Sequence, residues 1–295
     1  MKVYFDNAAT TSIDVVVLEA MLPYLKEHFG NPSTQYSYGR DTRAAIEDAR
    51  KSIAQLINAQ PNEIIFTSGG TEANNMAIKG SVNNLGVQRI ITSPIEHHCV
   101  EYSVDYCREI LKVETEFVKI DSNGNIDLEH LAQLLQHSNK KTLVSLMHAN
   151  NEIGTLLDIE KVGAMCKQYQ ALFHSDTVQT FAHFPIDVQQ CNVDFMSASA
   201  HKFHGPKGIG FLYMRKQNKV QSLIHGGGQE RGLRAGTENV YGIVGMAKKK
   251  KNAYEHLARD KAHILDVKNY FIFQLKENFN DIDFNGNTNE QSLFT

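Results

Sequence analysis

The feature that most constrains the fold is a regular alternation of short, largely apolar segments with segments of helical spacing. The expected strands lie at 63–67, 89–93, 114–120, 142–147, 171–174 and 194–198. The expected helices lie at 15–29, 41–57, 73–79, 103–111, 127–135 and 159–169. This rhythm predicts an α/β fold with a mostly parallel central sheet and helices on both faces. A last strand at 208–214 follows a short connection, which predicts antiparallel pairing.

The composition excludes several classes of protein. The net charge of −3 gives no reason to expect nucleic acid or a membrane surface as the main partner. No apolar run is long enough to cross a bilayer, and the first residues have no signal-peptide pattern, so we expect a cytoplasmic protein. The four cysteines, Cys99, Cys107, Cys166 and Cys191, form no CxxC pair or metal-like cluster. We therefore expect free thiols and no metal site.

One lysine stands where structure alone gives little reason for it. Lys202 follows the expected strand 194–198 and precedes a Gly-Pro turn. Lysine is seldom buried without a partner, and a partly desolvated lysine is a nucleophilic amine. Such an amine is what a Schiff base with an aldehyde cofactor requires. The structural alternative is a lysine whose ammonium group reaches solvent.

Other unusual polar residues also follow expected strands. They are Thr71 after the first strand, His97 after the second, Asn150 and Asn151 after the fourth, Asp176 and Gln179 after the fifth, and Ser199 and His201, beside Lys202, after the sixth. In an open parallel sheet the ligand binds outside the carboxyl ends of the strands. These positions therefore predict one ligand site at that edge of the sheet.

The residue types indicate what the ligand would be. Glycines at 69–70, followed by Thr71 and a helix start, suit a phosphate group. Asp176 needs a cationic partner, which a protonated pyridine nitrogen would provide, and Gln179 is placed to bond the ring hydroxyl. The ring of His97 would stack on the cofactor and relay protons. Taken singly, these residues also suit a Gly-rich turn, a helix N-cap and a structural histidine. Taken together, they predict a pyridoxal 5'-phosphate (PLP) site.

The order of motifs resembles the cysteine desulfurases of the NifS/IscS type, within the class-V aminotransferase branch of fold-type-I PLP enzymes. The matching stretches are Tyr4-Phe5-Asp6-Asn7-Ala8-Ala9-Thr10-Thr11, Gly30-Asn31-Pro32-Ser33, Phe66 to Asn75, Glu96-His97, Asn150 to Gly154, Asp176-Thr177-Val178-Gln179, Ser197 to Lys202, Gly205-Pro206-Lys207-Gly208 and His225 to Asn239. They run in constant order from near residue 3 to near residue 240.

The resemblance implies a role for each matching residue. Lys202 would bind the cofactor as a Schiff base, Asp176 would pair with the pyridinium nitrogen, Gln179 would contact the ring hydroxyl, and His97 would stack on the ring. Gly70, Thr71, Ser199 and His201 would form the phosphate site, and Asn151 would lie beside cofactor and substrate. Thr237 would reach the phosphate of a neighbouring subunit, which implies a homodimer. The implied reaction converts L-cysteine to L-alanine, and the sulfur passes as a persulfide to an acceptor such as an iron–sulfur scaffold or a thiolation enzyme.

The sequence departs from the family in one respect. The family's nucleophilic cysteine lies in a Ser/Gly-rich loop of the C-terminal domain, and these 295 residues contain no Ser-Gly-x-x-Cys segment. We therefore expect a truncated form with a large PLP-binding domain at 14–257. Residues 1–13 and 258–295 would form an incomplete small α+β domain, which puts sulfur transfer in question.

Two alternatives remain open from the sequence. One is another class-V PLP enzyme, an aminotransferase or a lyase that needs no protein thiol. The other is a PLP-binding dimer without catalytic activity that docks partners. Formation of alanine and sulfide from cysteine separates the leading interpretation from the first alternative, and cofactor absorbance separates it from the second.

Overall fold

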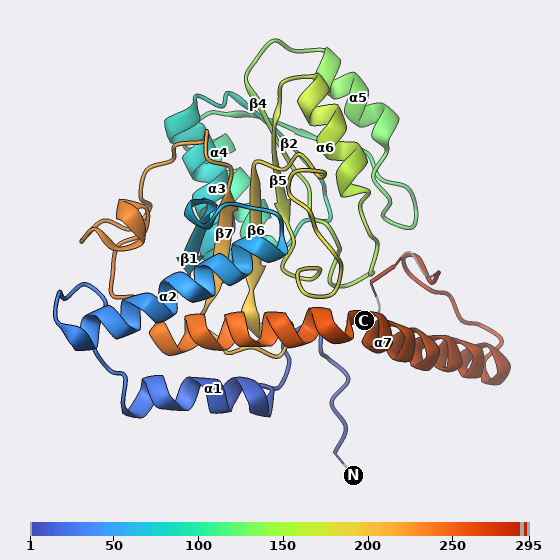
Figure 1. Cartoon of the computed structure of the whole chain (residues 1–295). Coiled ribbons are helices and arrows are strands. Elements are labelled where there is room, and N and C mark those ends of the chain that lie inside the picture. The colour runs from blue at the N-terminus through green and yellow to red at the C-terminus, as the bar shows by residue number, and fades with distance from the viewer. Residues whose placement is uncertain (1, 290–291, 294–295) are drawn as a thin grey trace.

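The computed structural model describes residues 2–289, 292 and 293, and its centre is a seven-stranded sheet (Figure 1). The strands are β1 (Ile64–Thr67), β2 (Arg89–Thr92), β3 (Glu114–Phe117), β4 (Thr142–Ser145), β5 (Leu172–Asp176), β6 (Phe195–Ser199) and β7 (Gly210–Met214). Their order across the sheet is β1-β7-β6-β5-β4-β2-β3. Neighbours from β6 through β3 pair in parallel, whereas β7 is antiparallel to both β1 and β6. The predicted mostly parallel sheet with an antiparallel last strand is confirmed.

Helices cover both faces of this sheet. They are α1 (Val15–Lys26), α2 (Ser37–Leu56), α3 (Gly70–Leu85), α4 (His98–Glu109), α5 (Leu128–Gln136), α6 (Ile159–Gln168) and α7 (Val240–Asn278), with short 3-10 turns η1 (Pro61–Glu63), η2 (Ala200–Lys202) and η3 (Gln229–Gly232). Each predicted helix is present. Three of them begin three to five residues earlier than their apolar spacing indicated, because their first turns consist largely of polar and small residues.

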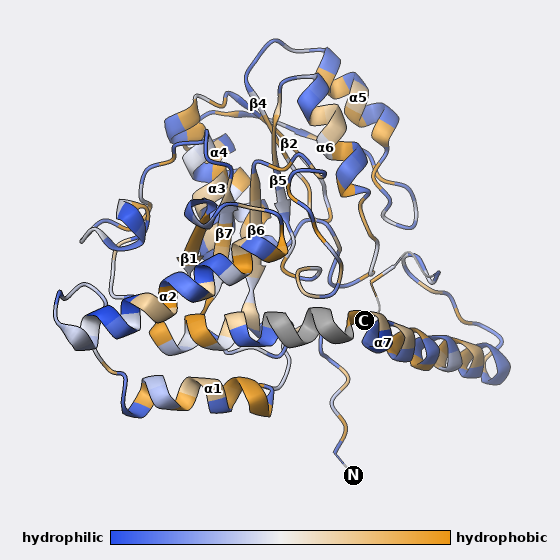
Figure 2. Cartoon of the chain, viewed as in Figure 1, coloured by the Kyte–Doolittle hydropathy of each residue, from blue (hydrophilic) through white to orange (hydrophobic). Residues whose placement is uncertain are grey.

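Two hydrophobic cores lie on opposite faces of the sheet. Successive residues of one strand point to opposite faces, so Ile64 packs in one core and Ile65 in the other. The first core contains residues of α2, α5, α6 and the start of α7, and the second contains residues of α3 and α4. The central strands are mainly apolar in Figure 2, whereas the helices alternate between apolar and polar residues.

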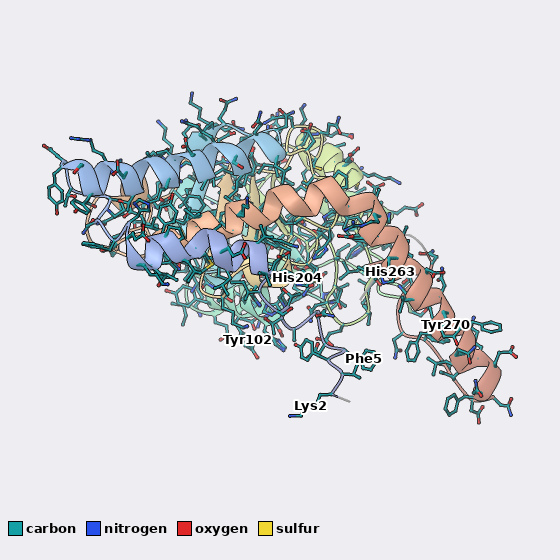
Figure 3. All side chains as sticks on the ribbon, turned by 60° about the horizontal axis from the view of Figure 1, so that its bottom comes forward. Lys2, Phe5, Tyr102, His204, His263 and Tyr270 are labelled. Carbon is teal, nitrogen blue, oxygen red and sulfur yellow. The ribbon has the colours of Figure 1, made fainter. Side chains whose placement is uncertain are left out.

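The longest helix, α7, reaches beyond the sheet. Its first half packs beside α1 and α2, and the part that carries His263 and Tyr270 projects from the body of the molecule (Figure 3). The predicted domain boundary at residue 257 falls inside this continuous helix, and the division into domains stays a prediction. Among the described residues, no helix is both long and apolar enough to span a bilayer.

Candidate active site

The strand ends bring the predicted site residues to one edge of the sheet. Asp176 is the last residue of β5 and Ser199 is the last residue of β6. Lys202 closes the 3-10 turn η2, which begins directly after β6. Thr71 lies in the first turn of α3, and His97 is the N-cap residue of α4. The topology thus collects side chains from β5, β6, α3 and α4.

A cavity of about 410 Å³ opens at the N-terminus of α3. It is lined by Ala9, Thr10, Ser68, Gly69, Gly70, Thr71, Glu72, Ser199, His201, Lys207 and Gly208. No side chain caps the N-terminus of this helix within the described part of the chain, so its N–H groups and dipole face the cavity. A Cβ atom at position 70 would collide with the side chain of Val178, so the cradle requires glycine there. Hydroxyl groups, helix N–H groups and cationic side chains together fit a phosphate dianion.

The lysine that the sequence singled out is half-buried and does not extend into solvent. Its Nζ donates hydrogen bonds to the backbone carbonyl oxygens of Ala8 and, at 3.0 Å, of Ala9. Burial lowers the pKa of the Lys202 amine below its usual value, although the negative charges of Asp176, Asp6 and Glu152 oppose that shift. A lowered amine pKa favours the unprotonated, nucleophilic form that a covalent bond to an aldehyde requires.

Asp176 is 5% exposed and is held by three hydrogen-bond donors. Its Oδ2 accepts from Asn74 Nδ2 at 2.7 Å, and its Oδ1 accepts from the Val178 backbone at 2.9 Å and from Ser197 Oγ at 3.3 Å. A turn and not a helix follows, so this aspartate is not a helix N-cap. These three donors fix the orientation of the carboxylate, and a buried aspartate of this kind suits a cationic ligand atom.

His97 is exposed and fixed by its own helix. Its Nδ1 accepts from the backbone N–H of Cys99 at 3.1 Å, which is the N-cap bond of α4, and lies 3.0 Å from Cys99 Sγ. Since Nδ1 is the acceptor, the neutral ring carries its proton on Nε2. Burial, with a contribution from the charge of Asp176, raises the pKa of the Cys99 thiol to about 11. Cys99 is therefore a thiol and not a thiolate at neutral pH.

The N-terminal segment forms part of the site, and its residue types alone did not predict this position. Gln179 Nε2 donates to Ala8 O at 3.0 Å, and His201 Nδ1 lies 3.1 Å from Thr10 Oγ1. Burial, together with the charges of Lys202 and Lys207, lowers the pKa of His201. The signal was the run of small residues before residue 10, which allows the backbone to approach the lysine closely.

Two predicted residues lie at the margin of the site. Asn151 is half-buried, and its Nδ2 donates to the neighbouring Glu152 Oε1 at 2.6 Å. Thr237 is exposed and lines a separate cavity of about 120 Å³, which shares Ser68 and Gly208 with the phosphate-sized cavity. The structure therefore places Thr237 next to the cradle and outside it.

Comparison with known proteins gives one consistent family. The model of the aminotransferase class-V family matches residues 3–294. The cysteine desulfurase IscS of Dictyoglomus turgidum is 47% identical over 287 residues, which cover 97% of this chain and 72% of that protein. A solved NifS-like protein superposes with a TM-score of 0.90 at 40% identity, over 94% of this chain and 76% of the other.

A second solved structure, described as SspA in complex with cysteine, superposes with a TM-score of 0.80 at 38% identity. It covers 85% of this chain and 72% of that one. The sheet order, the strand-end residues and these likenesses agree, and the chain belongs to the aminotransferase class-V family, in its branch of IscS- and NifS-like cysteine desulfurases.

Proposed function

We propose that this protein is a PLP-dependent cysteine desulfurase, which removes sulfur from L-cysteine and leaves L-alanine. The observation that carries the proposal is the grouping of a half-buried amine, a buried carboxylate and an open helix N-terminus at one edge of the sheet. The relatives add the substrate, since they are named cysteine desulfurases and one solved structure is described as a complex with cysteine.

Each part of the cofactor has a matching group in the chain. The phosphate would take the cradle of Gly70, Thr71, Ser199 and His201, and the aldehyde would bond to Lys202 Nζ. The ring would lie against His97, with its nitrogen at Asp176 and its hydroxyl at Gln179. These assignments are supported by the geometry of α3, β5 and β6, which points the side chains to the same edge of the sheet.

Bound PLP supplies an electron sink for the bonds at the α-carbon of an amino acid. The residues of the chain hold protons and charges where that chemistry needs them. Asp176 keeps a negative charge beside the ring nitrogen, and Lys202 provides an amine that can give and take a proton. His97 presents its N–H at Nε2, because Nδ1 is already an acceptor. Asn151 would orient the substrate from the loop after β4.

The desulfuration step requires a thiolate at the substrate sulfur. A thiolate R–S⁻ attacks that sulfur, the carbon–sulfur bond breaks, and the products are R–S–S⁻ and, after protonation of carbon, alanine. Burial raises the pKa of the thiols of Cys99, Cys107 and Cys191 to about 11 and that of Cys166 still higher. None of these four thiols is suited to the attack, so a thiol from elsewhere must accept the sulfur.

The experiment incubates the PLP-loaded chain with L-cysteine and dithiothreitol as the sulfur-accepting thiol. We expect alanine and sulfide in equal amounts, dependent on the added thiol and absent in Lys202→Ala. Pyruvate and ammonia would instead indicate a lyase, and a keto acid formed with an acceptor amino acid would indicate an aminotransferase. No product from a chain that retains PLP would refute catalytic function.

The assembly is also part of the proposal. We propose a homodimer in which the exposed Thr237 reaches the cofactor phosphate of the partner, with residues 14–257 as the large domain and 1–13 with 258–295 contributing to the small one. The sulfur acceptor would be an iron–sulfur scaffold or a thiolation enzyme. Free cysteines suit the reducing cytoplasm, which we propose as its location.

A further inference from the structure

Behind Asp176 lies a buried chain of hydrogen bonds that no role assigned above explains. Ser145 Oγ lies 2.8 Å from His174 Nδ1, and His174 Nε2 lies 3.0 Å from Asn74 Oδ1. Asn74 Nδ2 in turn donates to Asp176 Oδ2 at 2.7 Å. The side chains of Ser145, His174 and Asn74 are fully buried. The chain therefore ends on the carboxylate without contact with solvent.

The fold makes this chain from neighbouring positions. His174 and Asp176 are two residues apart on β5, so both face the same side of the sheet, toward α3. Ser145 is the cross-strand partner of His174 in the parallel register of β4 and β5. Asn74 lies in the second turn of α3, directly over that side. The sheet register and the helix thus fix all four side chains.

The direction of every hydrogen bond in the chain follows from chemistry. An ionised carboxylate only accepts, so the Asn74 atom that faces Asp176 must be the amide nitrogen. The amide oxygen then faces His174, whose Nε2 must carry a proton. Burial lowers the pKa of His174 to about 3, so the ring is neutral and its Nδ1 accepts from the Ser145 hydroxyl. A reversed amide would set two oxygen acceptors against each other at Asp176.

Asn74 also supports the histidine on the other side of the site. Its Nδ2 lies 3.2 Å from Cys99 Sγ, which lies 3.0 Å from His97 Nδ1. The amide has two hydrogens, so one serves Asp176 and the other serves the sulfur. The Cys99 sulfur thus lies between the Asn74 amide and the His97 ring, whose Nδ1 lone pair accepts from the Cys99 backbone N–H. One amide group therefore holds Asp176 directly and contacts His97 through the Cys99 sulfur.

We propose that Asn74 is the shared positioning residue of Asp176 and His97, and that neutral His174, protonated at Nε2, sets the orientation of its amide. This inference rests on the proposed PLP site and adds a supporting layer to it. Removal of either residue frees the carboxylate to rotate and weakens the hold on the cofactor ring. Hydrogen bonds to a charged group are among the strongest in proteins, so the expected loss of PLP affinity is about tenfold.

The first test needs no cofactor. The nitrogen chemical shifts of ¹⁵N-labelled histidine distinguish the two neutral tautomers and the imidazolium ion, with His174→Gln providing the assignment. We expect His174 to be neutral at pH 7 with its proton on Nε2. A proton on Nδ1, or a charged ring, would overturn the proposal.

The second test measures PLP affinity and the absorbance of the bound cofactor in full-length variants. Asn74→Leu and His174→Leu should weaken binding about tenfold and change the spectrum. His174→Gln keeps an N–H group near the position of Nε2, so this variant should bind PLP as tightly as the wild type does. The matched control is Asn218→Leu, which breaks a similar buried bond to Asp194 Oδ1 (3.0 Å) at the opposite end of β6 and should leave PLP binding unchanged.

The outcomes separate this inference from the proposed function. If wild-type protein fails to bind PLP, the proposed function is wrong, whatever the tautomer of His174. If wild type binds PLP and Asn74→Leu binds it as tightly as Asn218→Leu does, the positioning role is wrong and the PLP site stands.

Discussion

The buried ion pair between Arg50 on α2 and Glu230 on η3 provides a quantitative prediction. Arg50 donates from its two terminal nitrogens to the two carboxylate oxygens of Glu230 at 2.8 and 2.7 Å, and both side chains are at most 3% exposed. The same carboxylate accepts from the backbone N–H of Phe66 at 2.9 Å. Glu230 and Arg231 have φ angles of 46° and 59°, a strained conformation that these bonds stabilise. The ion pair therefore holds the loop that precedes Thr237 against β1.

Glu230→Gln keeps the shape of the side chain and leaves the buried Arg50 charge with only the partly exposed Glu47 carboxylate, 3.2 Å from Nε, as a counterion. Removing one partner of a buried pair costs about 3–5 kcal/mol of the free energy of unfolding. At about 2–4 °C for each kcal/mol, the melting temperature should fall by roughly 6–20 °C. Urea unfolding followed by circular dichroism gives the free energy directly.

Two matched variants make this result specific. Asp48→Asn breaks the surface pair of Lys51 and Asp48, at 3.4 Å and 66% and 76% exposed, and should cost less than about 1 kcal/mol. The double variant Arg50→Met, Glu230→Leu removes both charges and should recover part of the stability that Glu230→Gln loses. Equal losses in Glu230→Gln and Asp48→Asn would show that burial does not set the strength of this pair.

Other predictions concern single positions at the site. Burial raises the pKa of Glu96 from 4.5 to about 8. The free energy of unfolding should therefore decrease as the pH rises from 4.5 to 8, because Glu96 ionises in the unfolded chain before it ionises in the folded one. Glu96→Gln should remove this pH dependence, which urea unfolding at pH 5 and pH 8 measures. Asp176→Asn should lower alanine formation by about 100-fold or more while the unfolding midpoint changes little, and an unaltered rate would refute the role of the charge. Gly70→Ala should weaken PLP binding in equilibrium dialysis because its Cβ meets Val178, whereas Gly228→Ala, with open space around it, should not.

The order of elements was predictable because each signal was local. Apolar runs located the strands, and the short connection before β7 indicated its antiparallel direction. Asp127 was predicted to begin a helix, and it caps α5 by accepting from the backbone N–H of His130 at 2.9 Å. Helix starts were less accurate, because the first turns of α2, α3 and α4 contain too few apolar residues to show a periodicity.

The supporting contacts of the site could not be predicted, because they join residues that are far apart in the chain. Lys202 meets the carbonyls of Ala8 and Ala9 across 194 and 193 residues, and Asn74 meets Asp176 across 102. One clue was available for His174: it ends the expected strand 171–174 and precedes Asp176 by two positions, and the observed strand continues through Asp176, so both share one face. The sequence indicated the candidate residues for the chemistry, and the fold shows which groups hold those side chains in place.

The central claim is that the chain holds PLP through a covalent bond to Lys202, with the phosphate in the cavity beside α3. The most direct measurement reduces the PLP-loaded protein with borohydride and locates the cofactor by peptide mass spectrometry. We predict a single modified lysine, Lys202, and no adduct at that position in Lys202→Ala. Modification of another lysine, or no adduct in a protein that retains its fold, would contradict the account.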